Sequence, residues 1–454
     1  MAISSVKRHI HLFSFEFNSF VTKCHMAHSV SSEKSGEYSE SFRLYRTISG
    51  NAMCMPKANK APFLDPSDPN FSTRSDAVRR ARVESWFART PYGLAVLRYE
   101  EMKDMIMHPS LRQGSYRWPE HNRTSGLWSQ WWKRIMLNVE GDDHRRLRKL
   151  GAPAFAPKLV SALIPEFQAL CDELISGFAS TGKCEFMADF AEPYAARVIC
   201  SLVGVSGDQW RELTDHAVEM GYALGVNYAR DEPRVDAATE WFFDFARQVV
   251  ADRRACPRED FIGALISANA DKDSLSDQEL LDMIVLSIFG GIDTTRNQLG
   301  LAMATFVEHP EQWEILGSNP DLGRQAVEEV MRVRPTVTWV TREAVEDFEY
   351  KGLAIPKGTT IHLFSEAAAT DPEHFEPGFD ITVKRKQHFG FGGGKHHCIG
   401  SPIARGDMTE ALKMLAQRLK NPVPDGPPEW LPDSGNTGPL SLPIRFDPEE
   451  RRNA

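Results

Sequence analysis

The sequence has few cysteines and lacks any spacing typical of a disulfide framework. Its seven cysteines are odd in number, scattered, and never arranged as Cys-x-x-Cys. This usage is typical of a reducing compartment, so we expect a cytoplasmic protein. The cysteines are Cys24, Cys54, Cys171, Cys184, Cys200, Cys256 and Cys398.

Long apolar runs and an excess of positive charge are also missing. The longest apolar stretch near mid-chain, MIVLSIFGGI (283–292), lies between Asp282 and Asp293 and is too short to cross a bilayer, so we expect no membrane span. The formal net charge of −9 argues against non-specific binding to nucleic acid. At 454 residues, 42% hydrophobic and 25% charged, the composition is that of an ordinary soluble globular protein.

The first sixty residues differ from the rest of the chain. Their apolar residues are interrupted by polar ones and are followed by a stretch rich in Ser and Glu, without the apolar core and cleavage site of a secretory signal. Either this segment is a disordered extension, or it lies upstream of a true start at Met53 or Met55. We predict a disordered N-terminal extension over residues 1–60.

From about residue 75 onward the patterns predict mostly helices with short strands. Residues 158–205 predict two long helices, and residues 276–310 a further one that opens with a capping box of Ser276 and Glu279. Residues 348–364 predict a β-hairpin. The expected fold is mainly α with a minor β part, and we find neither internal repeats nor a linker.

The stretch FGFGGGKHHCIG (389–400) is dense in glycine around a single cysteine. A phosphate-binding loop would need Gly and Ser or Thr where Phe389 and His396 stand. A zinc site would need about four ligands, and the three consecutive candidates His396, His397 and Cys398 have no second pair nearby. The phosphate-binding loop is therefore excluded, and the zinc site is weakly supported.

A single thiolate approached by backbone is the interpretation that remains. Glycines let a chain lie close against a flat ligand, and the helix-forming residues after Cys398 place it at a helix N-terminus. Free amides there predict a lowered pKa for the thiol. This arrangement suits a ligand of haem iron. A structural cysteine in a glycine-rich turn fits this stretch equally well.

Two distant motifs decide between these alternatives. Glu329 and Arg332 stand at a helical i, i+3 spacing in EEVMRVRP, and GGIDTT (290–295) interrupts the long predicted helix. Together with the Cys398 stretch, these motifs resemble the cytochrome P450 family in all three of its signature regions, in order. The resemblance covers about residue 60 to the C-terminus and is strongest to the bacterial-type members. It implies a cytochrome P450 fold, with residues 61–454 forming a single haem-thiolate catalytic domain that binds haem b.

The family's roles transfer onto matching residues of this chain. Cys398 would be the axial thiolate ligand of the haem iron, with Phe391 packed near its sulfur. Glu329 and Arg332 would support the Cys398 loop. The haem propionates would be contacted by four further residues, which are His144, Arg148, Arg342 and His396.

The GGIDTT motif implies a role in oxygen activation. Gly290 and Gly291 each cost about 1 kcal/mol relative to Ala inside a helix, so a purpose is expected, such as space over a cofactor. By resemblance, Asp293 and Thr294 form the catalytic acid–alcohol pair. Thr294 would donate a hydrogen bond to the activated oxygen, and Asp293 would relay protons from solvent.

The resemblance implies a monooxygenase that inserts one oxygen atom of O₂ into a small lipophilic substrate. We expect residues 116–134 to form a variable loop whose tryptophans face the pocket or pack around it. A ferredoxin and its ferredoxin reductase would supply electrons to a monomeric enzyme, docking at bases that include HRRLRK (144–149), Lys395 and Arg405. The alternatives are a peroxide-driven haem-thiolate hydroxylase and a non-catalytic haem-binding or ligand-binding protein.

Overall fold

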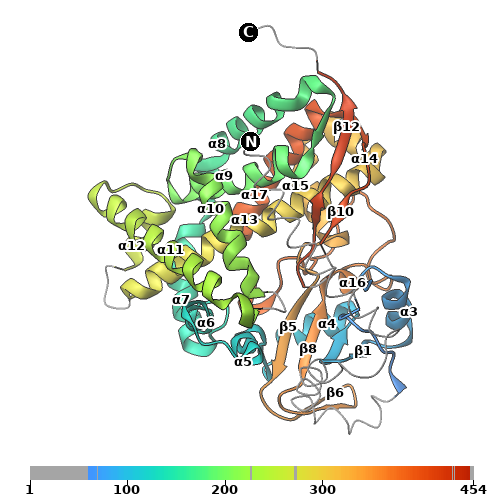
Figure 1. Ribbon diagram of the computed structural model, residues 1–454. Coiled ribbons are helices and arrows are strands. Elements are labelled where there is room, and N and C mark those ends of the chain that lie inside the picture. The colour runs from blue at the N-terminus through green and yellow to red at the C-terminus, as the bar shows by residue number, and fades with distance from the viewer. Residues whose placement is uncertain are drawn as a thin grey trace, which may run out of the picture.

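The computed structural model describes residues 60–449 except 69, 225–227, 270–273, 432 and 434. The extension predicted for residues 1–60 therefore lies, apart from Lys60, outside the described residues. The described chain forms a large helical body and a smaller part built on a β-sheet (Figure 1). The predicted mainly α fold with a minor β part is confirmed.

Helices make up most of the described chain. Their bounds are α3 (Asp76–Glu84), α4 (Tyr99–Met105), α5 (Trp118–Asn122), α6 (Leu127–Arg134), α7 (Gly141–Gly151), α8 (Pro157–Phe178), α9 (Glu192–Val203), α10 (Trp210–Gly221), α11 (Tyr228–Ala255), α12 (Phe261–Ala268), α13 (Asp277–Glu308), α14 (Pro310–Ser318), α15 (Gly323–Val333), α16 (Ser365–Ala369) and α17 (Ser401–Arg418).

The main sheet has the strand order β1-β2-β8-β5-β3, in which only the β2–β8 pair is parallel. Its strands are β1 (Phe87–Thr90), β2 (Gly93–Val96), β3 (Leu111–Gln113), β5 (Trp339–Ala344) and β8 (Thr360–Phe364). A smaller sheet has the order β4-β12-β9, and two further pairs are β6–β7 and β10–β11. These strands are β4 (Lys183–Glu185), β6 (Phe348–Tyr350), β7 (Leu353–Ile355), β9 (Lys420–Pro424), β10 (Glu429–Trp430), β11 (Pro439–Ser441) and β12 (Pro443–Asp447).

The long helix α13 runs through the middle of the helical body (Figure 1). Its predicted capping box is confirmed, since Ser276 accepts the amide of Glu279 and the Glu279 side chain accepts the amide of Ser276. Most of the second half of α13 is buried, because it packs against α9, α14, α15 and α17 within the main hydrophobic core. The two long helices predicted over residues 158–205 are α8 and α9, separated by β4.

The predicted hairpin over residues 348–364 is only partly correct. Strands β6 and β7 do pair across a tight turn at Lys351 and Gly352, both of which have positive φ. Strand β8 instead leaves the hairpin after Gly358 and pairs with β2 and β5. Its apolar residues Ile361 and Leu363 are fully buried, and burial in the sheet core outweighs continued pairing with β7.

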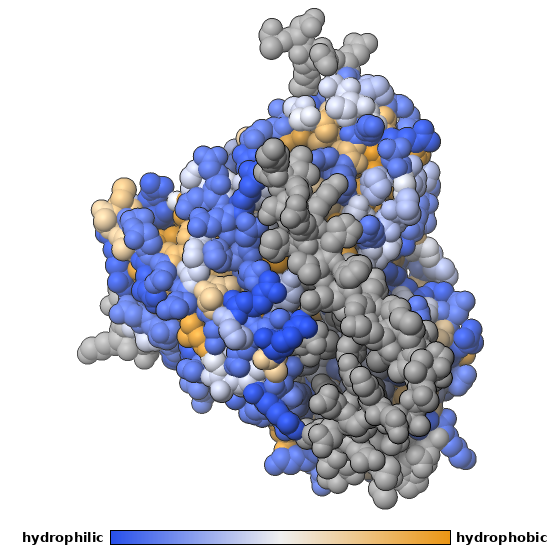
Figure 2. Space-filling view, viewed as in Figure 1, coloured by the Kyte–Doolittle hydropathy of each residue, from blue (hydrophilic) through white to orange (hydrophobic). Residues whose placement is uncertain are grey.

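The described surface on the face in Figure 2 is mainly hydrophilic, and its apolar residues occur in small separate areas. Among the described residues, no helix combines the length and the apolar character needed to span a bilayer.

Candidate active site

The glycine-rich loop before α17 folds into closed turns. The amide of Gly392 donates to the carbonyl of Phe389 (2.8 Å), and the amide of Cys398 donates to the carbonyl of Phe391 (2.9 Å). Two of these positions favour glycine. Gly394 has φ of 64°, in the left-handed region, and a Cβ on Gly393 would lie 2.8 Å from the side chain of Ile106. The glycines therefore let the loop pass close to the end of α4.

Cys398 is exposed to solvent, yet protein atoms crowd around its sulfur. This local burial raises the pKa of the thiol. Hydrogen bonds from the amides of Gly400 and Ser401, at the start of α17, oppose that rise without cancelling it. The prediction of a lowered thiol pKa is therefore wrong, because the thiolate loses more hydration than these amides replace.

The carboxylate of Glu140, near this loop, interacts with three polar groups. Its Oε1 interacts with Nε2 of His396 (3.1 Å) and accepts the amide of Gln113 (2.8 Å), and its Oε2 pairs with Nζ of Lys395 (2.5 Å). Burial would raise the pKa of Glu140, but these hydrogen bonds lower it to about 2. Sequence reasoning missed Glu140. Its position directly before the acidic start of α7 was the available signal.

The four predicted propionate contacts collect at the same place. The rings of His144 and His396 lie 4.3 Å apart, and burial lowers the pKa of His144 to about 4. Arg342 is 4% exposed, donates to the Gln113 side chain, and has a pKa lowered by burial to about 10. Arg148 is half-buried, interacts electrostatically with Cys398, and has no recorded ion pair within the described chain.

This cluster contains more basic side chains than acidic ones. His144, Arg148, Arg342 and His396 converge, with Glu140 as the one carboxylate that interacts with them in the described residues. Buried positive charge is costly unless anions compensate it. Haem carries two propionate groups and an iron that accepts a cysteine thiolate. The residues present therefore fit haem.

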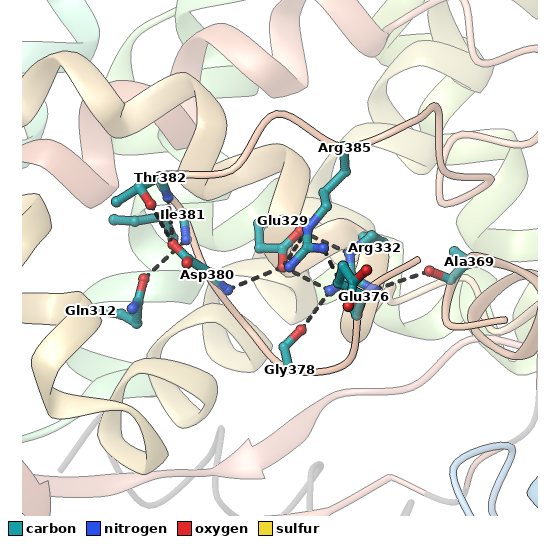
Figure 3. Close-up of polar contacts among 10 residues, drawn as sticks. All are labelled: Gln312, Glu329, Arg332, Ala369, Glu376, Gly378, Asp380, Ile381, Thr382 and Arg385. Atoms are coloured by element: carbon teal, nitrogen blue, oxygen red, sulfur yellow. Dashed lines mark hydrogen bonds and ion pairs between the residues drawn. The ribbon is translucent and has the colours of Figure 1, made fainter. Parts of the chain in front are cut away.

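The pair Glu329–Arg332 is fully buried, each side chain being 2% exposed (Figure 3). Arg332 donates to both carboxylate oxygens of Glu329 (2.7 and 2.8 Å) and to the carbonyls of Ala369 (3.0 Å) and Gly378 (2.7 Å). Glu329 also accepts the amide of Asp380 (3.1 Å). Nε of Arg385 also lies 3.8 Å from the Glu329 carboxylate (Figure 3). The pair therefore contacts residues within 369–385, the segment that leads toward the Cys398 loop.

Helix α13 runs unbroken through the GGIDTT motif, so the predicted interruption is wrong. Its two glycines have different surroundings. Gly290 is exposed and a Cβ there would meet nothing within 4 Å, whereas a Cβ on Gly291 would lie 2.5 Å from Ile199 of α9. Gly290 therefore faces open space, and Gly291 allows α9 to pack closely.

The predicted acid–alcohol pair has partners that the sequence pattern did not indicate. The Thr294 hydroxyl donates to the carbonyl of Gly290 (2.8 Å). The carboxylate of Asp293 pairs with Arg296 (2.8 Å) and accepts from Asn297 (3.2 Å) and Asn436 (3.1 Å). Arg296 lies three residues after Asp293 and was detectable as an i, i+3 pair. Asn436 is far away in the sequence and gave no local signal.

The tryptophan-rich segment 116–134 folds mainly into helices α5 and α6, so the predicted loop is wrong. Trp128 and Trp131 are fully buried, and Trp128 stacks on Trp132 with ring centroids 4.6 Å apart. Trp131 meets Phe289 of α13 edge-on at 6.0 Å. The amphipathic spacing of these tryptophans favours a helix, and their main role is packing of α6 against α11 and α13.

Comparison with known proteins identifies the family of this chain. Residues 321–445 match the family model described as Cytochrome P450. The chain is 36% identical to luteothin monooxygenase of Streptomyces thioluteus, over 88% of this chain and 99% of that protein. It is 32% identical to mycinamicin IV hydroxylase/epoxidase of Micromonospora griseorubida, over 78% and 91% respectively. The crystal structure of CalO2 superposes with a TM-score of 0.76 at 27% identity, covering 83% of this chain and 99% of CalO2.

The fold and the thiolate site define a haem-thiolate oxygenase. The chain belongs to the cytochrome P450 family, in its bacterial type. It is a monooxygenase that uses haem b held by a cysteine thiolate, and its reaction requires O₂ and redox partners.

Proposed function

We propose that this enzyme hydroxylates a small lipophilic molecule held in the open space beside Gly290. The observation that carries the proposal is the pairing of an accessible Cys398 thiol with a central helix whose Gly290 faces empty space. The half-buried Leu286 and Phe289, on the same helix, would supply apolar contacts to the substrate. The names of the relatives, a monooxygenase and a hydroxylase/epoxidase, support the same reaction class.

The residues that would hold haem are those of the Cys398 loop and the basic cluster. Cys398 would provide the axial thiolate, and Phe391, whose carbonyl accepts the Cys398 amide, would pack beside it. The propionates would be bound by His144, Arg148, Arg342 and His396. Haem bound in this way supplies the activation of O₂ for insertion into a C–H bond. Displacement of Lys395 and His396 from Glu140 would free them for a propionate.

The protons for this reaction would be handled by Asp293 and Thr294. Thr294 has a hydroxyl that donates to Gly290 at rest and can turn toward the open space beside that residue. An ion pair with Arg296 and a hydrogen bond from Asn436 fix the position of the half-exposed Asp293 carboxylate. From there the carboxylate would transfer protons from solvent. The presence of both groups favours an O₂-dependent reaction over a peroxide-driven one, because peroxide already contains the required protons and electrons.

The electron donor would be an acidic ferredoxin with its reductase. On α7, Arg145 and Lys149 are exposed and stand four residues apart, on one helix face. Most of the predicted bases have acidic partners: Arg145 pairs with Asp142, Arg146 with Glu279, Lys395 with Glu140 and Arg405 with Glu328. The docking charge would therefore centre on Lys149, which forms no ion pair in the described chain, with the exposed Arg145 beside it. The buried cysteines Cys171, Cys184 and Cys200, which form no disulfide in the described chain, support an enzyme of the cytoplasm, which would act as a monomer.

The test is a spin-state titration of the purified haem protein with a library of small lipophilic compounds. Each hit is then incubated with a bacterial ferredoxin, its reductase, NADH and O₂. We expect spin-shifting compounds to yield products carrying one additional oxygen atom, labelled when ¹⁸O₂ is used. Binding without any NADH-dependent product would favour the ligand-binding alternative, and product formed only with added peroxide would favour the peroxide-driven one.

A further inference from the structure

A cavity of about 280 Å³ lies between α3, α16 and the segment after α16. Figure 1 shows α3 and α16 side by side next to the main sheet, on the opposite side of the molecule from α11 and α12. No residue predicted to contact haem lines this cavity. Its lining residues are Thr73, Arg74, Val78, Arg79, Arg82, Glu366, Ala367, Thr370, Pro372, Phe375, Pro377 and Gly378.

Two guanidinium groups in this lining have unused donors. Arg82 is 9% exposed, and its Nη1 donates to the carbonyl of Ala367 and to the hydroxyl of Thr370, but its buried Nε has no partner. Nη1 of Arg74 is also buried without a partner. Within the described chain neither arginine forms an ion pair. Buried donors without acceptors are rare in folded proteins, so these two indicate a missing acceptor.

Glu366 contributes a third unpartnered group to the same lining. It is 7% exposed, and its buried Oε2 has no hydrogen-bond partner. Burial raises the pKa of Glu366 to about 8, although the charges of Arg74, Arg334 and Arg79 act against the rise and that of Asp433 adds to it. At neutral pH the carboxyl group is therefore mostly protonated, and it can donate a hydrogen bond to an anion instead of repelling it.

The rest of the lining is apolar. Val78, Ala367 and Phe375 are at most 5% exposed, and Pro372 and Pro377 complete this side. A volume of about 280 Å³ is at the small end of ligand pockets. It accommodates a compact body in addition to an anionic group.

We propose that this cavity is a second ligand site, which binds a small organic carboxylate with a compact apolar body. The ligand's carboxylate oxygens accept hydrogen bonds from Arg74, Arg82 and protonated Glu366, and its body lies against Val78 and Phe375. The two guanidinium groups thereby gain a hydrogen-bonded anion, in addition to the charge of Asp371 that already acts on Arg82.

Occupancy of this site would stabilise the segment that the Glu329–Arg332 pair holds. Gly378 lines the cavity, and its carbonyl accepts from Arg332, as does the carbonyl of Ala369 (Figure 3). A ligand that binds only the native protein raises its stability in proportion to occupancy. The site is thus placed to link a metabolite's concentration to the stability of residues 369–378, with no contact to the Cys398 loop.

The test is calorimetric titration of the haem enzyme with benzoate at pH 7, with imidazole bound at the iron so that benzoate cannot bind the metal. Benzamide, which has the same body without the charge, and inorganic phosphate, which has charge without the body, are titrated in parallel. We expect benzoate to bind at least about tenfold more tightly than either. Arg74→Gln and Arg82→Gln should each weaken benzoate about tenfold or more, because each removes a charge-assisted hydrogen bond.

Arg80→Gln is the matched control, since Arg80 is exposed on the same helix and does not line the cavity. It should leave benzoate binding unchanged. Absence of benzoate binding, equal binding of benzamide or phosphate, or full affinity in Arg74→Gln would each overturn the proposal. Arg74→Gln breaks no recorded side-chain hydrogen bond, so it remains decisive if Arg82→Gln fails to fold.

The pH dependence of benzoate binding tests the role of Glu366 separately. As pH rises through about 8, the carboxyl group ionises and repels the ligand, so benzoate should bind progressively more weakly. Glu366→Gln stays neutral and should retain its pH 7 affinity at pH 9. A wild-type affinity that does not change between pH 7 and pH 9 would contradict the assignment of Glu366 as a donor.

Discussion

Replacing Arg332 by Met should destabilise the enzyme strongly, because it removes the hydrogen-bonded counter-ion of the buried Glu329 and leaves only Arg385, whose Nε lies 3.8 Å from the Glu329 carboxylate. Both side chains are 2% exposed, and Arg332 makes two hydrogen bonds to Glu329 and two to backbone carbonyls. Breaking a buried ion pair by removing one partner costs about 3–5 kcal/mol. This is a large fraction of the roughly 5–15 kcal/mol by which a domain is stable. We therefore expect Arg332→Met to lower the free energy of unfolding by about 4 kcal/mol.

The assay is urea unfolding of the haem enzyme followed by far-ultraviolet circular dichroism, with haem absorbance recorded in parallel. Arg247→Met is the matched control, because Arg247 and Asp244 have the same i, i+3 spacing on α11 but are 54% and 67% exposed. The control should cost no more than about 1 kcal/mol.

The double variant Glu329→Met with Arg332→Met distinguishes two causes of destabilisation: the charge that a single variant leaves without its partner, and a general loss of packing. Because it removes both charges, it should be more stable than the sum of the two single effects predicts, by about 1–3 kcal/mol. Additive losses, or a cost for Arg332→Met as small as that of the exposed control, would refute the reasoning.

Three further predictions concern protons, electrons and pH. Thr294→Ala should consume NADH at a near-normal rate but release hydrogen peroxide in place of product. Asp293→Asn should instead slow the whole cycle, because proton delivery is impeded. Both variants are measured by the rate of NADH consumption and by the product formed per NADH consumed. Reversal of charge at Arg145 and Lys149 together should slow reduction by a ferredoxin and flatten its dependence on salt in stopped-flow experiments. In Glu328→Gln, the free energy of unfolding should fall less steeply at acid pH than it does in the wild type. Burial would raise the pKa of Glu328, but hydrogen bonds from His388 and Arg405 lower it to about 2, so its contribution is complete above about pH 4.5 and is lost as pH falls toward 2. Its partial exposure limits that contribution to about 2 kcal/mol, which is measured by urea unfolding at several pH values.

A defined result would contradict each of these predictions. Fully coupled product formation by Thr294→Ala would mean that another group positions the proton. Lys357, exposed on the turn before β8, is the control for charge reversal, and an equal slowing by Lys357→Glu would exclude a specific role for α7. The exposed Glu314 on α14 is the control for the pH series. An unchanged acid limb in Glu328→Gln would show that this carboxylate does not titrate as argued.

The helices and the Cys398 loop could be predicted because their signals are local. The capping box of α13 and the helices on either side of β4 follow from spacing within one or two turns. The course of β8 could not be predicted in this way. It depends on burial of Ile361 and Leu363 against distant strands, which a turn signal at Gly358 does not encode.

In the candidate site, too, the features that depend on local sequence could be predicted, and those that depend on distant parts of the chain could not. Residues of the three family motifs were identifiable from sequence, but their partners Glu140 and Asn436 come from other parts of the chain. The thiol pKa of Cys398 was predicted in the wrong direction, since the amides at a helix N-terminus are a local feature and burial is a tertiary one. Burial of Trp128 and Trp131 likewise depends on packing against α11 and α13.

The most direct test of the account is the absorption spectrum of the reduced protein with carbon monoxide, compared between the wild type and Cys398→Ser. If Cys398 is the axial ligand, the wild type shows the red-shifted band of thiolate ligation, and Cys398→Ser loses it. Cys200→Ser, which changes a buried cysteine of α9, is the control and should retain the band. Survival of the red-shifted band in Cys398→Ser would contradict the central claim.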